Sequence, residues 1–220
     1  MSIKMRIVEA LQGRVRLGVV ALEGVEVRAS DPALDAEVDR YCAELAARYG
    51  GGRSAEVPGA ADARTLYKAL GLDPTKTRPS NEALLRRALK GQTLYRISTL
   101  VDALNLSSLQ EQLPFGLYDL DKLTPPVTLR LGDPGEGYEG IRKAVVHVEG
   151  RPVQVDAQGP FGNPTSDSAR TMIRLETGRA LVTCYAPIAC RPDRMSGVLD
   201  RTRDTLVRVC GGTESDRQIF

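Results

Sequence analysis

Hydrophobic residues near the N-terminus first alternate with polar ones and then continue without a break. Val15, Leu17 and Val19 alternate, and the apolar run goes on through Leu22. Alternation is typical of a strand with one buried face, whereas a continuous run is typical of a strand buried on both faces. The pattern therefore predicts β-structure within residues 1–28, with the unbroken part inside the core.

Further along, hydrophobic residues recur at the three- and four-residue spacing of a helix. Asp31 and Pro32 suit the N-cap and first turn, so they predict a helix that ends at a run of three glycines. The same spacing predicts four more helices, over residues 61–70, 81–91, 98–113 and 195–210. Ser80 and Ser98 are predicted to begin the second and third of these, and the tail after Gly212 is expected to fray.

Four later segments have the composition of strands. They cover residues 127–131, 141–148, 153–156 and 180–185, with a turn-rich loop over 132–140. Strands and helices are mixed without strict alternation, which favours an α+β domain with a β core over a doubly wound parallel sheet. No repeat, low-complexity segment or linker divides the chain, so we expect one domain over residues 1–220.

The most unusual stretch follows the strand at 153–156. It contains two glycines and two prolines around Asn163 and continues into the polar run at 165–168. Glycines let a ligand approach the backbone, prolines fix the shape of a loop, and a polar run offers a helix N-terminus that can receive an oxyanion or phosphate. We expect this loop to be the functional centre, held against a second polar segment at 105–119.

Composition excludes several classes of protein. The chain is 42% hydrophobic and 26% charged, with a formal net charge of +2, which does not favour a strongly basic nucleic-acid module. The absence of Trp and the low aromatic content count against a binder that works mainly by base stacking. A local basic cluster is nevertheless present, and it is either a solvated helix face or a phosphate-contacting patch. Its members are Lys76, Arg78, Arg86, Arg87 and Lys90.

Neither a membrane span nor a metal site is expected. No apolar stretch is long enough to cross a bilayer, and the N-terminus lacks the apolar core of a signal peptide, so a cytoplasmic location is expected. The four cysteines form no CxxC pair, and His147 is the only histidine, so we predict no metal or cofactor. His147 is either an ordinary strand histidine or part of a catalytic pair or triad.

One region resembles a known family. The segment VDALNLSSLQEQLPFGLYDLDKL, with Asp102, Asn105 and Asp119, is similar to the editing domain of the bacterial phenylalanyl-tRNA synthetase β subunit. The segments RPS at 78–80 and GYEGIRKAVVHVEGRPVQVDAQG at 137–159 fit the same pattern. The resemblance implies a mostly antiparallel, sandwich-like β core with helices packed on the outside.

The resemblance also implies an activity, which is hydrolysis of the ester between a wrong amino acid and a tRNA. A free-standing version acts in trans, as a monomer in our expectation. The histidine of the family motif falls at Gly116, so no general base is carried over. The alternatives are a non-catalytic module that binds tRNA or an amino acid, and a hydrolase for another small ester or amide.

Candidate residues follow from the loop and the resemblance together. We expect Asp156, Ser166 and Asp167, or else the terminal ribose hydroxyl of the tRNA, to position the attacking water. Backbone N–H groups of 159–163 or 165–168 are expected to stabilise the oxyanion. The expected substrate-binding residues are Asn105, Ser107, Ser108, Phe115, Gly116, Asp119, Gly159, Pro160, Phe161, Gly162, Asn163, Thr165 and Ser168. The expected tRNA-binding residues are Lys76, Arg78, Arg86, Arg87 and Arg170.

Structural roles remain open for the acidic residues and for Arg170. Asp119 has the alternative of capping a turn, and Asp156 that of ending its strand. Ser166 and Asp167 have the alternative of capping a helix that follows them. Arg170 has the alternative of pairing with a neighbouring carboxylate.

Overall fold

A computed structural model of the chain describes residues 3–142 and 144–220, and it confirms the predicted α+β fold. Its helices are α1 (Pro32–Tyr49), α2 (Ala60–Ala69), α3 (Ser80–Leu89), α4 (Thr99–Glu111) and α5 (Pro192–Cys210). Its strands are β1 (Met5–Ile7), β2 (Val15–Glu23), β3 (Phe115–Asp119), β4 (Val127–Leu131), β5 (Gly137–Glu139), β6 (Val145–His147), β7 (Pro152–Asp156), β8 (Gly159–Gly162), β9 (Arg179–Pro187) and β10 (Thr213–Ile219).

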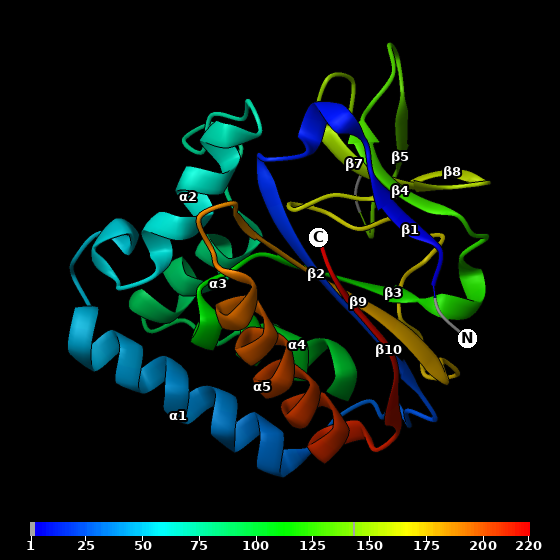
Figure 1. Cartoon of the computed structure of the whole chain (residues 1–220). Helices are drawn as coiled ribbons and strands as arrows, with labels where there is room; N and C mark the ends of the chain where they lie inside the picture. Colours follow the sequence, from blue (N-terminus) through cyan, green and yellow to red (C-terminus); the bar gives the residue numbers. More distant parts are fainter. Residues whose placement is uncertain (1–2, 143) are drawn as a thin grey trace.

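The elements stack in three layers (Figure 1). The middle layer is a four-stranded antiparallel sheet in the order β10–β2–β9–β3. Helices α1, α3, α4 and α5 cover one of its faces, and the second sheet, β1–β4–β7–β8, packs on the other through a shared apolar cluster that α2 joins. Strands β5 and β6 form a separate hairpin beside the second sheet. The sandwich-like core with outer helices is thus confirmed.

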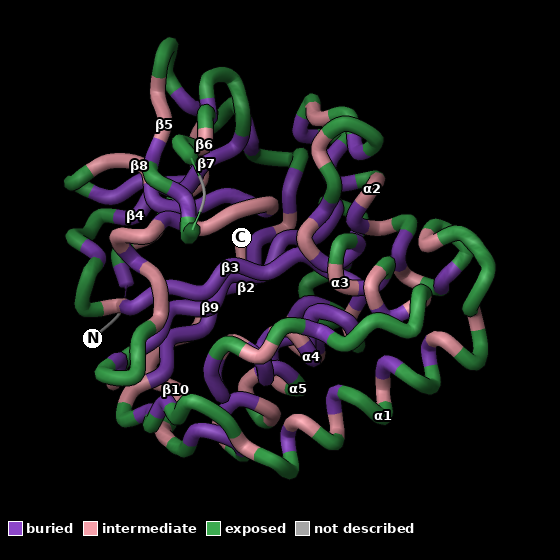
Figure 2. The backbone as a smooth tube through the Cα atoms, turned by 180° about the vertical axis from the view of Figure 1, so that it is seen from behind, coloured by how far each residue is buried: buried purple, intermediate pink, exposed green. Residues whose placement is uncertain are grey.

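Strand β2 confirms the interpretation of the N-terminal pattern. Val20 and Leu22 pack into the cluster on the helical side, while Leu17 and Val19 pack into the cluster between the sheets. Successive side chains point to opposite faces of a strand, so a strand covered on both faces must be apolar throughout. β2, β3 and β9 are accordingly buried along nearly their whole length (Figure 2).

The predicted helix at 31–49 is also confirmed, together with its cap. The Asp31 carboxylate accepts hydrogen bonds from the backbone N–H groups of Ala33 at 2.9 Å and Leu34 at 3.1 Å. Ser80, in contrast, is already helical, with Pro79 at the N-cap position. Ser98 does occupy the N-cap position of α4, but its side chain makes no capping bond there.

Four predicted segments differ from the structure, and the first is the turn-rich loop at 132–140, which contains strand β5. The tail after Gly212 forms β10, which pairs with β2 along residues 213–219, because Gly211 and Gly212 adopt positive φ and turn the chain back. Its polar sequence gave no strand pattern. The predicted loop at 159–162 is strand β8, paired with β7. The predicted strand at 141–148 is reduced to 145–147 among the described residues.

Candidate functional site

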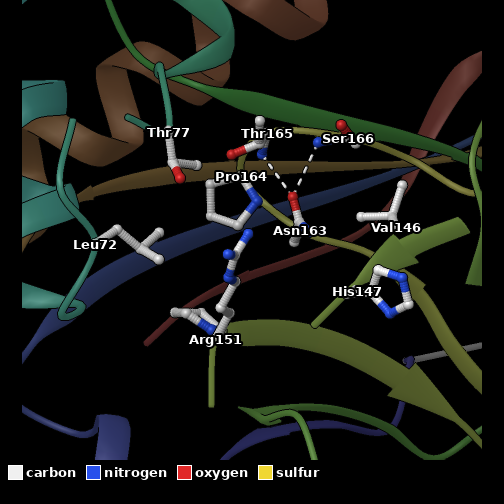
Figure 3. Close-up of a pocket in the computed structure, with 10 residues that line it drawn as sticks. Leu72, Thr77, Val146, His147, Arg151, Asn163, Pro164, Thr165 and Ser166 are labelled. Carbon is white, nitrogen blue, oxygen red and sulfur yellow. Dashed lines mark hydrogen bonds between the residues drawn. The ribbon is translucent and has the colours of Figure 1, made fainter. Parts of the chain in front are cut away.

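The loop that was predicted to be the functional centre lines a pocket of about 310 Å³. One wall is the loop itself and another is the segment before α3, while the β5–β6 hairpin and the start of β7 complete it (Figure 3). The lining residues are Leu72, Thr77, Val146, His147, Arg151, Pro152, Asn163, Pro164, Thr165 and Ser166. Segments far apart in the sequence therefore meet at one hollow.

The loop at 163–166 is a tight turn built around Asn163. The side-chain oxygen of Asn163 accepts hydrogen bonds from the N–H groups of Thr165 at 2.8 Å and Ser166 at 2.9 Å (Figure 3). The N–H of Asn163 donates in turn to the carbonyl of Ser166 at 3.0 Å. Asparagine favours such turns because its short amide reproduces a backbone hydrogen bond.

Two tyrosines hold this turn from either side. The hydroxyl of Tyr67 on α2 donates to the carbonyl of Pro164 at 2.9 Å and lies 2.9 Å from the Thr165 hydroxyl. The hydroxyl of Tyr138 on β5 donates to the carbonyl of Ser166 at 2.5 Å. Burial raises the pKa of both phenols, so they stay protonated and continue to donate.

These bonds occupy four of the N–H groups that were expected to form an oxyanion hole. The N–H groups of Asn163, Thr165 and Ser166 are all bonded within the turn, and that of Ser168 donates to the carbonyl of Phe161. Residues 169–178 are described throughout and form turns, not a helix, so no helix N-terminus is present behind Ser168. The prediction that Ser166 or Asp167 caps a following helix is therefore wrong.

The opposite wall contributes His147, which the sequence left open as a catalytic residue, and two side chains that it did not single out, Arg151 and Thr77. Arg151 lies at the turn before β7 and extends toward the Asn163–Pro164 turn, and His147 lies at the end of β6 (Figure 3). Thr77 comes from the loop before α3 and stands between Lys76 and Arg78. The sequence does place His147 and Arg151 on either side of the predicted turn at Gly150. It does not show that this turn faces the loop at 163–166.

Asp156 is bound to Arg170. The two carboxylate oxygens of Asp156 accept from the Arg170 guanidinium at 2.8 and 3.0 Å, and also from the N–H groups of Thr124 and Gln158. The Asp156 side chain is fully buried, and Arg170 lies 5.9 Å from the centre of the Phe161 ring. The alternative in which Arg170 pairs with a carboxylate is confirmed, and the pair fixes the β7–β8 turn.

The remaining loop residues also have structural partners. Phe161 is completely buried between the sheets, and Ser168, which is 1% exposed, contacts the Thr171 hydroxyl at 3.2 Å. Gly159, Pro160 and Gly162 belong to β8. Asp167 accepts from the N–H of Leu117 at 3.4 Å, which ties the loop to the edge of β3. None of these residues lines the pocket.

The second polar segment is divided between two sides of the central sheet. Ser107 and Ser108 are buried and donate to the carbonyls of Ala103 and Leu113. Phe115 packs into the cluster on the helical side, and Asn105 lies on α4. These four residues are separated from the pocket by the sheet. Asp119 caps the turn after β3, because its carboxylate accepts from the N–H of Asp121 at 3.0 Å and from the Thr177 hydroxyl at 2.9 Å.

Gly116 faces the space between the two sheets, and that space is already occupied. A Cβ atom at Gly116 or at Gly162 would overlap the Tyr118 hydroxyl, so this phenol lies directly between the two glycines. Tyr118 is completely buried, and its ring packs edge-on against Phe161 with centroids 4.8 Å apart. Burial and the nearby Asp167 carboxylate raise the pKa of Tyr118. A larger residue at position 116 is thus incompatible with Tyr118 in this position.

A metal centre finds no support in the described part of the chain, where no group of three or more His, Cys, Asp or Glu side chains gathers. The four cysteines, Cys42, Cys184, Cys190 and Cys210, are all buried free thiols. None of the helices described is long and apolar enough to cross a membrane.

The fold and the pocket define an α+β domain in which a tyrosine-held turn faces a basic wall. Residues 62–196, more than half of the 220-residue chain, match the B3/4 domain family, and the chain belongs to that family. The matched range contains every residue that lines the pocket.

The chain is also similar to a solved structure, an N-terminal fragment of the phenylalanyl-tRNA synthetase β-subunit from Pyrococcus horikoshii. The TM-score is 0.52 and the sequence identity 13%, so the likeness concerns the fold alone. The match covers 100% of this chain and 54% of the other, which means that the chain spans about half the length of that fragment. A comparison with curated proteins finds no match.

Proposed function

We propose that this protein hydrolyses the ester of mischarged aminoacyl-tRNA, acting in trans as a single cytoplasmic domain over residues 1–220. The observation that carries the proposal is the pocket, where hydroxyl groups, an imidazole and a guanidinium meet at a turn fixed by two tyrosines. Membership of the B3/4 family and the likeness to a synthetase fragment support an RNA-linked substrate.

The side chains of the pocket suit the end of an aminoacylated tRNA. Arg151 is exposed at the rim and provides a charge for the terminal phosphate, with Lys76 and Arg78 on the adjoining loop. The hydroxyls of Thr77, Thr165 and Ser166 offer partners for the ribose and the ester. Leu72, Val146 and the prolines of the pocket give the amino-acid side chain an apolar surface.

His147 supplies the proton transfer in this proposal. An imidazole can accept a proton near neutral pH, so His147 takes one from a water molecule as that water attacks the ester carbonyl. The bond between the carbonyl carbon and the ribose oxygen then breaks, and the ribose oxygen receives the proton. Ser166 positions the water, while Asp167 anchors the loop to β3. Asp156 acts through its ion pair, by holding the β7–β8 turn.

A non-catalytic binding module is the second candidate, and one observation favours it. The N–H groups of the turn are consumed internally, so they are not available to stabilise an oxyanion. Positioned donors of that kind account for about 3 kcal/mol or more in acyl-transfer enzymes. A protein without them can still bind the ester strongly and protect it.

Deacylation separates the two candidates. We would incubate the protein with tRNAs that carry cognate or noncognate amino acids and follow the loss of the ester over time. The expected result is selective hydrolysis of one mischarged species, slowed about 100-fold or more by His147→Ala. Retained binding of the same tRNA without turnover would establish the binding module instead.

Matched variants make the assignment specific. Arg151→Ala is expected to raise KM with little change in kcat. The reason is that a contact with a phosphate contributes the same binding free energy in the ground state and in the transition state. Arg40→Ala is the control, since Arg40 is an exposed arginine on α1 on the helical side of the molecule. Equal effects of the two arginine variants would count against the pocket as the substrate site.

A further inference from the structure

Two large hydrophobic side chains stand exposed beside the basic helix α3. Tyr95 is 67% exposed and Ile97 is 55% exposed, whereas Leu94 is buried. Exposure alternates along this segment between α3 and α4, where Leu94 and Ser98 are buried and Tyr95 and Ile97 are exposed. Arg96, between them, turns the other way and pairs with Asp39 at 2.6 Å on α1. Tyr95 and Ile97 therefore form one apolar platform.

The tyrosine of this platform is held in place by Arg87. The Arg87 guanidinium lies 4.1 Å from the centre of the Tyr95 ring and donates to the Tyr95 hydroxyl at 3.1 Å. It also donates twice to the carbonyl of Thr93, at 2.9 and 3.2 Å, which fixes the backbone just before the ring. One side of the ring is thus covered by a cation, and most of the ring surface remains open to solvent.

The other end of the platform is tied to α4. The N–H of Ile97 donates to both carboxylate oxygens of Asp102, each at 3.1 Å. The platform is therefore ordered before any partner arrives, and preorganisation lowers the entropic cost of binding. An isolated exposed hydrophobic residue needs no explanation, but two that are fixed on one side of the chain indicate a contact surface.

The charge around the platform points to an anionic partner. Four cations before and along α3 form no salt bridge with the described residues, and these are Lys76, Arg78, Arg86 and Lys90. Elsewhere the exposed arginines of the helices are commonly paired, as Arg201 is with Glu111. Residues 86 and 90 are one helical turn apart, and both are exposed on the helix whose Arg87 contacts Tyr95.

We infer that Tyr95 and Ile97, with Arg86 and Lys90, bind unpaired nucleotides of a single-stranded RNA segment. A nucleobase stacks on the open face of Tyr95, its sugar packs on Ile97, and the cations contact the adjacent phosphates. The low aromatic content of the chain does not oppose this, because one fixed ring suffices for one base. The loop that carries Lys76 and Arg78 connects this surface to the pocket, since Thr77 lines it. The inference extends the proposed RNA substrate and rests on it.

Fluorescence anisotropy with a labelled oligoadenylate tests the surface directly. The single strand is expected to bind more tightly than the same strand annealed to its complement, because a duplex does not expose base faces. Tyr95→Ala is expected to weaken binding of the single strand roughly tenfold or more, while Tyr95→Phe retains most of it. The Arg86→Ala, Lys90→Ala double variant is expected to lower the salt dependence of binding.

Controls decide between this surface and the pocket. Leu175→Ala removes a hydrophobic side chain that is also 55% exposed but lies elsewhere, and it is expected to have no effect. Equal binding by wild type and Tyr95→Ala, or equal binding of single strand and duplex, would overturn the inference, as would an absence of oligonucleotide binding. Arg40→Ala, the control variant on α1, is expected to leave binding of the oligoadenylate unchanged. A protein that binds the single strand through Tyr95 but never deacylates tRNA would refute the proposed reaction and keep the surface.

Discussion

The two faces of the central sheet are buried to the same extent but are built from different chemistry. On the helical face, β9 contributes Ala180, Val182 and Cys184 to an apolar cluster with α4 and α5. On the opposite face the same strand contributes Thr183 and Tyr185, both completely buried. Because side chains alternate along β9, its two hydroxyl-bearing side chains lie on the face between the sheets, and small apolar side chains lie on the helical face.

The polar face leads to the pocket, and the apolar face does not. Gln154 on β7 donates to the Tyr185 hydroxyl at 2.6 Å, which bridges the two sheets. Tyr67 and Tyr138 use their hydroxyls on the turn that lines the pocket. Buried polar groups contribute little net stability when they are satisfied, but they fix one geometry. We therefore expect the helical face to determine stability and the inter-sheet face to determine the shape of the site.

The largest expected effect tests the apolar face. Leu106 on α4 is completely buried in the helical cluster, so Leu106→Ala removes apolar contacts and leaves a cavity. We expect the free energy of unfolding to fall by about 2–5 kcal/mol in urea titration. Binding at the pocket, measured well below the unfolding midpoint, is expected to stay unchanged. A loss of binding with little loss of stability would break the distinction between the two faces.

The next effect tests the crowding between the sheets. Gly116→Ala places a methyl group where the Tyr118 hydroxyl lies and about 2.8 Å from the Thr183 hydroxyl. We expect a loss of about 3 kcal/mol in unfolding free energy, because neither group has room to move. Tyr118→Phe removes the obstructing oxygen, so the double variant is expected to recover part of that loss.

A double-mutant cycle on these two positions gives the measurement. The coupling between them is expected to be favourable and above about 0.5 kcal/mol, as for residues in direct contact. Additive effects would show that Tyr118 does not occupy the space beside Gly116. The cycle also bears on the resemblance, in which the histidine of the family motif falls at position 116.

Much of the fold was predictable because local patterns carry it. The apolar run through β2 indicated a strand buried on both faces, and Asp31 with Pro32 indicated the start of α1. β10 was not predictable, because its residues are polar and half-exposed at the edge of the sheet. Its pairing with β2 is set by tertiary contacts that no local window contains.

The site was predictable only in part, for a similar reason. The turn at 163–166 was found through its asparagine and proline, which act locally. Arg151 was missed, and the role of His147 was left open, because their position at the pocket depends on how the β5–β6 hairpin packs. Asp156 and Arg170 are fourteen residues apart, and nothing in the spacing distinguishes a buried ion pair from a catalytic carboxylate.

A smaller effect concerns Asp102, a buried carboxyl on the helical side. Burial raises its pKa to about 6, although the N–H of Ile97 opposes the shift. The folded state therefore holds this proton more tightly than the unfolded state, and the associated stability is present below about pH 4 and is lost as the pH rises through 6. Asp102→Asn removes this titration.

Urea unfolding across pH gives the measurement for Asp102. Relative to the Asn variant, the wild-type protein is expected to lose about 2 kcal/mol of unfolding free energy between pH 4 and pH 7. Parallel pH profiles for the two proteins would show that Asp102 titrates normally. The result bears on the comparison because Asp102 is a buried polar group on the helical side, where it holds the backbone of Ile97 and does not contact the pocket.

The smallest effect on stability is expected to have the largest consequence for the site. Tyr67→Phe removes the hydroxyl that donates to the Pro164 carbonyl and contacts Thr165, at a cost of about 1 kcal/mol in unfolding free energy. The pocket wall loses one of its two tyrosine supports, so we expect hydrogen exchange at 163–166 to accelerate and ligand affinity at the pocket to fall. Leu106→Ala, which costs more stability, is expected to leave exchange in this turn unchanged under conditions where the protein stays folded. The contrary outcome is that hydrogen exchange at 163–166 accelerates in both variants in proportion to their loss of unfolding free energy. Exchange in the turn would then report global unfolding, and the inter-sheet hydroxyls would have no separate role in shaping the site.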